Sequence, residues 1–126
     1  MATRCYIGFK DGDLYKDIYC HNDGYLEYTG SILLEYYNSL DRIKALLELG
    51  DLSYIGARIS EHDPLTSDDD SVVFSYWRDR GESMANVQPR LHKDNSTLRF
   101  DAFAYLFEDG KWYYRTWEES EYIPLG

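Results

Sequence analysis

His21 and Asp23 are the first side chains in this sequence that could carry out chemistry. They belong to a turn-forming segment, residues 21–25, that follows a strand-like run. A carboxylate near an imidazole fixes its tautomer and raises its pKa, so the pair could act as general acid and base in a small hydrolase. No nucleophile motif accompanies the pair. We therefore favour a turn in which Asp23 accepts backbone hydrogen bonds and Gly24 has a positive φ.

Arg78 and Arg80 form the most basic local patch of the chain, directly after the aromatic Trp77. Two guanidinium groups beside aromatic rings can clamp a phosphate or stack on a base, which would suit a small nucleotide. This alternative ligand-binding site consists of His21, Asp23, Tyr25, Trp77, Arg78 and Arg80. We favour a simpler interpretation, in which the two arginines form ion pairs with Asp79, Glu82 and the acidic loop.

Two acidic clusters offer a surface for a protein partner. One is the aspartate run at residues 68–70, and the other lies at residues 118–121. Carboxylates spaced like phosphates can occupy the nucleic-acid-binding groove of another protein. The predicted partner-binding residues are Asp68, Asp69, Asp70, Glu118, Glu119 and Tyr25. A solvated loop and a polar C-terminal segment are the simpler interpretation of the same two clusters.

Candidate metal ligands are few and poorly spaced. Cys5, Cys20 and His21 match no zinc pattern, even with His62 or His92 added, and neighbouring strand residues point to opposite faces. The acidic residues between positions 11 and 17 lack the glycine and the final glutamate of a calcium loop. We predict no metal site, no cofactor and no catalytic residue.

The charge and the aromatic content favour a binding protein. There are 13 basic and 23 acidic residues, which give a net charge of −10. Such a chain is repelled by bare nucleic acid and by anionic membranes and is attracted to basic protein surfaces, although solubility alone explains the charge. The 13 tyrosines are typical of a recognition surface, and strand-forming residues of a core explain them equally well.

The sequence carries no sign of export or membrane insertion. No stretch approaches the roughly 20 apolar residues that span a bilayer, and residues 1–4 lead into a strand-like run without a signal-peptide core. We expect the protein to stay in the cytoplasm. Cys5 and Cys20 are too few for a disulfide scaffold, so we expect two buried thiols.

A hairpin is the first of the elements that position these side chains. Apolar residues alternate through residues 3–21, with turn-forming residues in the middle. A two-residue loop at Gly12 and Asp13 would place Cys5 opposite Cys20 and turn one apolar face inward.

Two short helices and a loop follow the hairpin. Helical spacing of apolar residues predicts one helix within residues 29–38. A second helix begins after the Ser39 cap and runs through Leu49, where Gly50 supplies the C-terminal stop. Residues 61–70 are polar and should form a solvated loop.

The sequence pattern of the second half of the chain predicts further strands. Residues 72–77 read as a strand, and residues 78–94 are too polar and irregular for us to assign. The strongest hairpin signal joins residues 98–107 to residues 112–117 through an Asp109-Gly110 turn.

These elements together predict one α+β domain over residues 1–126. We expect a mostly antiparallel sheet of about five strands, with two short helices packed on one face. The helices must cover the sheet because each carries an apolar stripe. No internal repeat or linker is visible.

Three short segments carry a family resemblance: His-x-Asp-Gly-Tyr at residues 21–25, Leu-Gly-Asp-Leu-Ser at 49–53 and Arg-Asp-Arg-Gly-Glu at 78–82. On these segments, and over most of its length, the chain resembles a family of small, uncharacterised bacteriophage and prophage accessory proteins. Asn22 and Leu26 stand where Trp and Pro are expected, so the first turn departs from the pattern. The resemblance implies a viral protein made inside an infected bacterium, and it implies no activity or site.

We therefore expect a non-enzymatic phage accessory protein that binds and inhibits a host protein in the host cytoplasm. A nucleic-acid-binding component of antiviral defence, such as a CRISPR effector, is the favoured target, and direct contact with nucleic acid or membrane is not expected. One alternative is a sponge that sequesters a small nucleotide immune signal, in a pocket that could lie between the subunits of a homo-oligomer. The other is the hydrolase that would use His21 and Asp23.

Overall fold

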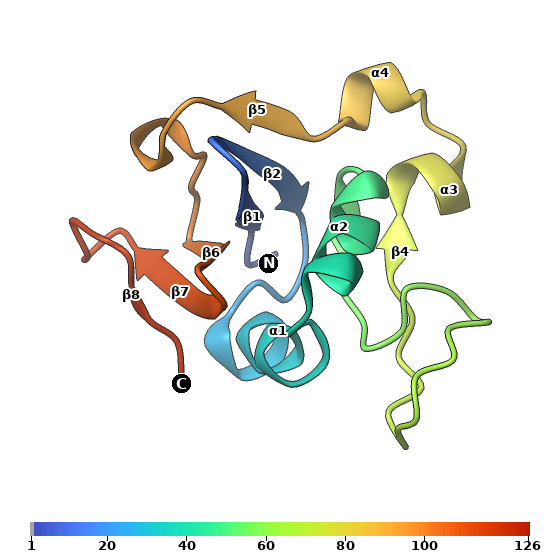
Figure 1. Ribbon diagram of the computed structural model, residues 1–126. Helices are drawn as coiled ribbons and strands as arrows, with labels where there is room; N and C mark the ends of the chain where they lie inside the picture. Colours follow the sequence, from blue (N-terminus) through green and yellow to red (C-terminus); the bar gives the residue numbers. More distant parts are fainter. Residues whose placement is uncertain (1) are drawn as a thin grey trace.

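The fold is α+β, with one mixed sheet and short helices beside it (Figure 1). The computed structural model describes residues 2–126. The strands are β1 (Cys5–Asp11), β2 (Leu14–Cys20), β3 (Leu52–Tyr54), β4 (Phe74–Ser75), β5 (Arg90–His92), β6 (Phe103–Glu108), β7 (Lys111–Thr116) and β8 (Ile123–Pro124). The helices are α1 (Ser31–Tyr36), α2 (Leu40–Glu48), α3 (Tyr76–Arg80) and α4 (Met84–Val87), with a π-helical turn η1 (Leu26–Gly30) and a 3-10 turn η2 (Asn95–Thr97). Within the described residues no helix is long and apolar enough to cross a membrane.

The sheet is larger and more mixed than the sequence predicts. Its eight strands run in the order β4-β3-β2-β1-β6-β7-β8, and β5 pairs with β2 beside β3. The β1–β6 and β2–β3 pairs are parallel, which corrects the prediction of a mostly antiparallel sheet of about five strands. The prediction was wrong because hairpin signals report only strands that are adjacent in the chain, whereas β6 reaches β1 after a long excursion.

Both predicted hairpins are present. In the first, Gly12 (φ 63°) and Asp13 form the loop and Cys5 lies opposite Cys20. In the second, Asp109 and Gly110 have φ values of 52° and 80°, as a type I′ turn requires. The two thiols of the first hairpin are free and fully buried.

The predicted helix starts and stops are confirmed for α2. The Ser39 hydroxyl accepts a hydrogen bond from the Arg42 N–H, which caps the first turn. Gly50 ends the helix with a φ of 74°. A Cβ on this glycine would also lie 2.4 Å from the Val87 carbonyl oxygen, so the site demands glycine for space as well. The other predicted helix is split into η1 and α1.

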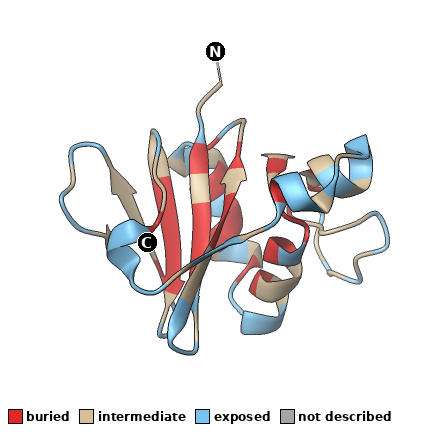
Figure 2. Ribbon diagram, turned by 90° about the horizontal axis from the view of Figure 1, so that it is seen from above, coloured by how far each residue is buried: buried red, intermediate tan, exposed pale blue. Residues whose placement is uncertain are grey.

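The hydrophobic core lies between the sheet on one side and α1 and α2 on the other (Figure 2). Aromatic residues of this core form hydrogen bonds to loops. The hydroxyl groups of Tyr37 and Tyr105 donate to the carbonyls of Gly56 and Gly24 at 2.8 and 2.7 Å. The Trp112 indole donates to the Tyr37 carbonyl at 2.8 Å. Part of the high tyrosine content is therefore structural, because each buried ring also carries a hydroxyl that satisfies a loop carbonyl.

The region after residue 70 departs most from the predicted elements. Only Phe74–Ser75 is a strand, and Trp77 lies in α3 instead. Ser75 causes the change, since its side chain caps the N–H of Arg78 while its own N–H donates to Asp79. Residues 78–94, which the sequence left unassigned, contain α4 and β5. The strand predicted from residue 98 begins only at Phe103, the first residue of β6.

Candidate functional site

The face of the sheet turned away from α1 and α2 carries polar and aromatic side chains. Because side chains alternate along a strand, residues such as Tyr6, Tyr19 and Tyr113 point away from the buried Ile7 and Ile18. The Tyr6 and Tyr19 rings pack with their centroids 5.4 Å apart. We call this the outer face, and the segments around η2 and β8 border it.

Asp17 is the buried centre of the outer face. Its side chain is only 2% exposed and accepts two hydrogen bonds from the Arg99 guanidinium, at 2.8 and 3.0 Å. The Arg99 backbone N–H donates to its second oxygen at 2.9 Å. His92 Nε2 lies 3.0 Å away, so one carboxylate fastens both β5 and the residue 99 segment to β2.

The His92 ring also contacts a hydroxyl group through the nitrogen that does not face Asp17. Thr97 Oγ1 lies 3.2 Å from His92 Nδ1, which gives an acid, imidazole and hydroxyl in series. Arg99 already compensates the Asp17 charge, so little of that charge remains to stabilise an imidazolium during proton transfer. We interpret the arrangement as a structural clamp. Sequence reasoning considered Asp17 and His92 only as weak metal ligands.

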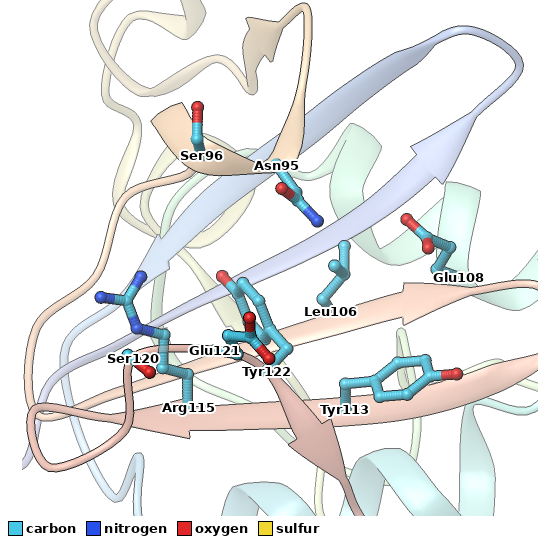
Figure 3. Close-up of a pocket in the computed structure, with 9 residues that line it drawn as sticks. All are labelled: Asn95, Ser96, Leu106, Glu108, Tyr113, Arg115, Ser120, Glu121 and Tyr122. Carbon is cyan, nitrogen blue, oxygen red and sulfur yellow. The ribbon is translucent and has the colours of Figure 1, made fainter.

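A hollow of about 490 Å³ opens on the outer face beside this clamp (Figure 3). Its walls come from β6, β7, η2 and the turn before β8. Arg115 and Glu108 lie toward opposite ends of it, with Leu106, Tyr113 and Tyr122 between them (Figure 3). The other lining residues are Asn95, Ser96, Ser120 and Glu121. This site could not be predicted from the sequence, because its walls come from four separate segments.

The charged groups at the two ends of the hollow are held in place by the protein. Arg115 Nε donates to the Glu119 carbonyl at 3.1 Å, and its guanidinium lies 5.1 Å from the centre of the Phe100 ring. Glu108 accepts a hydrogen bond of 2.6 Å from the Tyr15 hydroxyl. Burial raises the pKa of Tyr122 to about 12, so its hydroxyl stays a donor at neutral pH.

The predicted acid and base pair does not form. His21 Nδ1 lies 2.6 Å from the Tyr19 hydroxyl, while Asp23 is exposed and raises the pKa of Tyr25. The positive φ also lies at Asp23 (57°) and not at Gly24, which corrects the predicted turn. Gly24 is required for space, since a Cβ there would lie 2.8 Å from the Cβ of Cys5.

The two arginines of the alternative nucleotide site are engaged within the chain. Arg78 donates to the carbonyls of Ile59 and Val73 and pairs with Asp79 at 2.9 Å. Arg80 pairs with Glu82, and its guanidinium lies 4.2 Å from the centre of the Tyr76 ring. The pairs with Asp79 and Glu82 are those favoured from the sequence, whereas no ion pair of the described residues joins either arginine to the acidic loop. Nη1 of Arg80 has no hydrogen-bond partner among these residues. Trp77 is 43% exposed on α3.

The two acidic clusters lie at opposite edges of the sheet. Residues 68–70 precede the edge strand β4, whereas Glu118 and Glu119 lie between β7 and the other edge strand, β8. The Asp69 carboxylate accepts hydrogen bonds from the N–H and hydroxyl of Ser71, which lower its pKa. Tyr25 is exposed beside Asp23, ahead of η1. The predicted partner-binding residues therefore do not form one continuous surface.

Trp117 is an exposed residue that the predicted site omitted. It is 76% exposed and directly precedes Glu118. The turn that carries it is hydrogen-bonded: the N–H groups of Glu118 and Glu119 donate to the Thr116 hydroxyl and carbonyl at 3.3 and 3.0 Å. The available signal in the sequence was a large apolar residue beside two glutamates at the end of a strand.

Groups of three or more metal-binding side chains are absent from residues 2–126. Comparison with family models, with curated proteins and with solved structures finds no match.

Proposed function

We propose that this chain is a non-enzymatic bacteriophage accessory protein that binds and inhibits a host protein. A basic, nucleic-acid-binding component of host defence, as in CRISPR interference, is the favoured target. The proposal follows from the net charge of −10 and from the turn that presents Trp117.

The exposed Trp117 ring is the observation that carries this proposal. A tryptophan left 76% exposed gains little from the fold, whereas burial of such a ring is a common source of binding energy at interfaces. The hydrogen bonds that hold the turn reduce the entropy lost when the ring docks. Glu118 and Glu119 flank the ring on one side, which favours a basic surface around the partner's pocket.

The side chains of the two alternative sites bond to other groups of the protein, which supports a binding protein over an enzyme or a nucleotide sponge. Arg78 and Arg80 bond within the chain, which weakens the nucleotide alternative. His21 pairs with Tyr19 and makes no contact with Asp23 among the hydrogen bonds of the described residues, which weakens the hydrolase alternative.

Affinity capture from a host lysate tests the proposal. Wild-type protein should retain a basic host protein that mass spectrometry can identify, and Trp117→Ala should lose it. Trp77→Ala is the matched control, because Trp77 is 43% exposed on α3, beyond the β4 edge of the sheet. Equal recovery with Trp117→Ala and wild type would contradict the proposed contact.

The charge component can be separated from the ring. Glu118→Lys should weaken capture and reduce its sensitivity to salt, because a steering charge has been reversed. Asp68→Lys reverses an exposed charge at the opposite edge of the sheet and should leave capture unchanged if the β7–β8 turn is the contact.

A further inference from the structure

The hollow on the outer face is built for a molecule with opposite charges at its two ends. Arg115 pairs with Ala104 across the hairpin, and Glu108 lies four residues beyond Ala104 along β6. At the rise of a strand, that separation is about 13 Å between backbone positions. The two charged side chains lie toward opposite ends of the hollow in Figure 3.

Each end has bonding capacity that the protein leaves unused. Among the described residues, Arg115 donates only from Nε, so neither Nη group has a hydrogen-bond or ion-pair partner. At the other end, Glu108 uses only Oε1, in its bond from Tyr15. The Tyr15 pKa is raised to about 12, first by that bond and then by burial and by the charges of Glu108, Asp109 and Asp94. The Glu108 end therefore offers a carboxylate oxygen without a partner among the described residues, and the Arg115 end offers a guanidinium held at Nε.

The middle of the hollow combines Leu106 and two tyrosine rings with polar groups, among them the Asn95 carboxamide (Figure 3). Leu106 forms part of the floor at 2% exposure, and the rings of Tyr113 and Tyr122 lie beside it. The Tyr122 hydroxyl, in the wall between Leu106 and Arg115 (Figure 3), adds a neutral donor. Glu121 also lines the hollow, so its carboxylates outnumber its single guanidinium. A polyanion such as a nucleotide triphosphate is disfavoured here.

We infer that the hollow binds a short free peptide, with its C-terminal carboxylate on Arg115 and its N-terminal ammonium near Glu108. An extended peptide covers about 13 Å with four residues, which is comparable to the separation of the backbone positions that carry the two charged side chains. The volume of about 490 Å³ lies within the usual range for small-molecule pockets. Guanidinium capture of a carboxylate provides direction, and the Tyr113 and Tyr122 rings contact the middle of the peptide.

This site is independent of the proposed protein contact. Trp117 does not line the hollow, and the peptide would be held by residues on β6, β7 and the turn before β8. Failure of peptide binding would leave the host-protein proposal intact, and loss of host-protein capture in Trp117→Ala would leave the peptide site intact.

Nuclear magnetic resonance titration with tetra-alanine tests the inference. Tetra-alanine with free ends should shift the amide signals of residues 113–115 and 120–122 in a saturable way. Its C-terminal amide and its N-acetyl derivative should each bind about tenfold more weakly, since each loses a charge-assisted hydrogen bond. Absence of saturable shifts up to 10 mM peptide would overturn the inference.

Substitutions should abolish each preference separately. Arg115→Gln should bind the free acid and the amide equally, and Glu108→Gln should bind the free amine and the acetylated peptide equally. Each comparison is the ratio of the affinities of two peptides for the same variant, so a partial loss of stability in that variant affects both affinities equally. Tyr122→Phe provides a milder test of the carboxylate end, and Glu61→Gln, an exposed position outside the hollow, should behave as wild type. Preferences that persist in Arg115→Gln and Glu108→Gln would contradict the assigned contacts.

Discussion

The Asp17 carboxylate lies 2.8 Å from the Arg99 guanidinium, although 82 residues separate them in the chain. Within residues 2–126, every hydrogen bond and ion pair between β2 and the residue 99 segment joins Asp17 to Arg99, and His92 of β5 bonds to the same carboxylate. The clamp sets the border of the outer face, where the hollow lies. It therefore connects the stability of the fold to the geometry of the candidate site.

Asp17→Asn should lower the free energy of unfolding by about 3 kcal/mol, because it leaves a partly buried guanidinium without its charge partner. Asp11→Asn is the matched control, since Asp11 forms only half-exposed ion pairs with Lys16 and Lys44 and should cost less than about 1 kcal/mol. Urea denaturation followed by fluorescence measures both. Equal effects of the two substitutions would show that the Asp17 clamp contributes little.

Asp63 should make the protein less stable in acid. Burial acts to raise the pKa of Asp63, but the N–H groups of Ile59 and Leu65 and the Arg42 guanidinium outweigh it and lower that pKa. A folded pKa below the unfolded value of about 3.9 gives stability that is present above pH 3.9 and lost as the pH falls through the folded value. The free energy of unfolding should therefore decline less between pH 5 and pH 2 in Asp63→Asn than in wild type. Parallel declines would refute this role.

Gly24→Ala should destabilise the protein by about 1–3 kcal/mol, because the new methyl group meets Cys5 at 2.8 Å and the Thr3 carbonyl oxygen at 2.9 Å. The adjacent Asp23→Gly should not destabilise it, since glycine adopts the φ of 57° without steric cost. Thermal unfolding of the two variants distinguishes crowding from backbone conformation. A tolerated Gly24→Ala would mean that the first turn moves away from β1 readily.

Cys5 and Cys20 should resist alkylation in the native protein at pH 8. Burial raises the pKa of the Cys5 thiol well above its usual value, and the neighbouring Cys20 raises it further, so little thiolate is present. Both residues are 0% exposed. Mass spectrometry after treatment with iodoacetamide should show modification only when denaturant is added. Rapid labelling without denaturant would indicate that the first hairpin opens easily.

Local features of the fold were predictable from sequence because their causes are local. The Gly12 and Asp109-Gly110 turns set the two hairpins, and Ser39 with Gly50 sets the bounds of α2. The parallel β1–β6 pairing was missed because the contacts that fix it join segments that are remote in the chain. The same holds for the Asp17 clamp, since nothing near Asp17 in sequence indicates Arg99.

The candidate sites were predicted less well than the elements. The arginine ion pairs of α3 followed from neighbouring charges, so they could be foreseen. The strand predicted at residues 72–77 was wrong because the capping bonds of Ser75 outweigh the strand preference of the apolar and aromatic residues around it. The hollow could not be foreseen, because its walls meet only after β7 pairs with both β6 and β8.

In the proposed function, the Trp117 turn binds a basic host protein. The most direct measurement is the dissociation constant for the captured partner, determined by calorimetry at low and high salt for wild type, Trp117→Ala and Trp77→Ala. We expect Trp117→Ala to weaken binding at least about 30-fold, as for an interface hot spot, Trp77→Ala to match wild type, and added salt to weaken all three. Wild-type affinity in Trp117→Ala, or affinity that does not change with salt, would contradict the account.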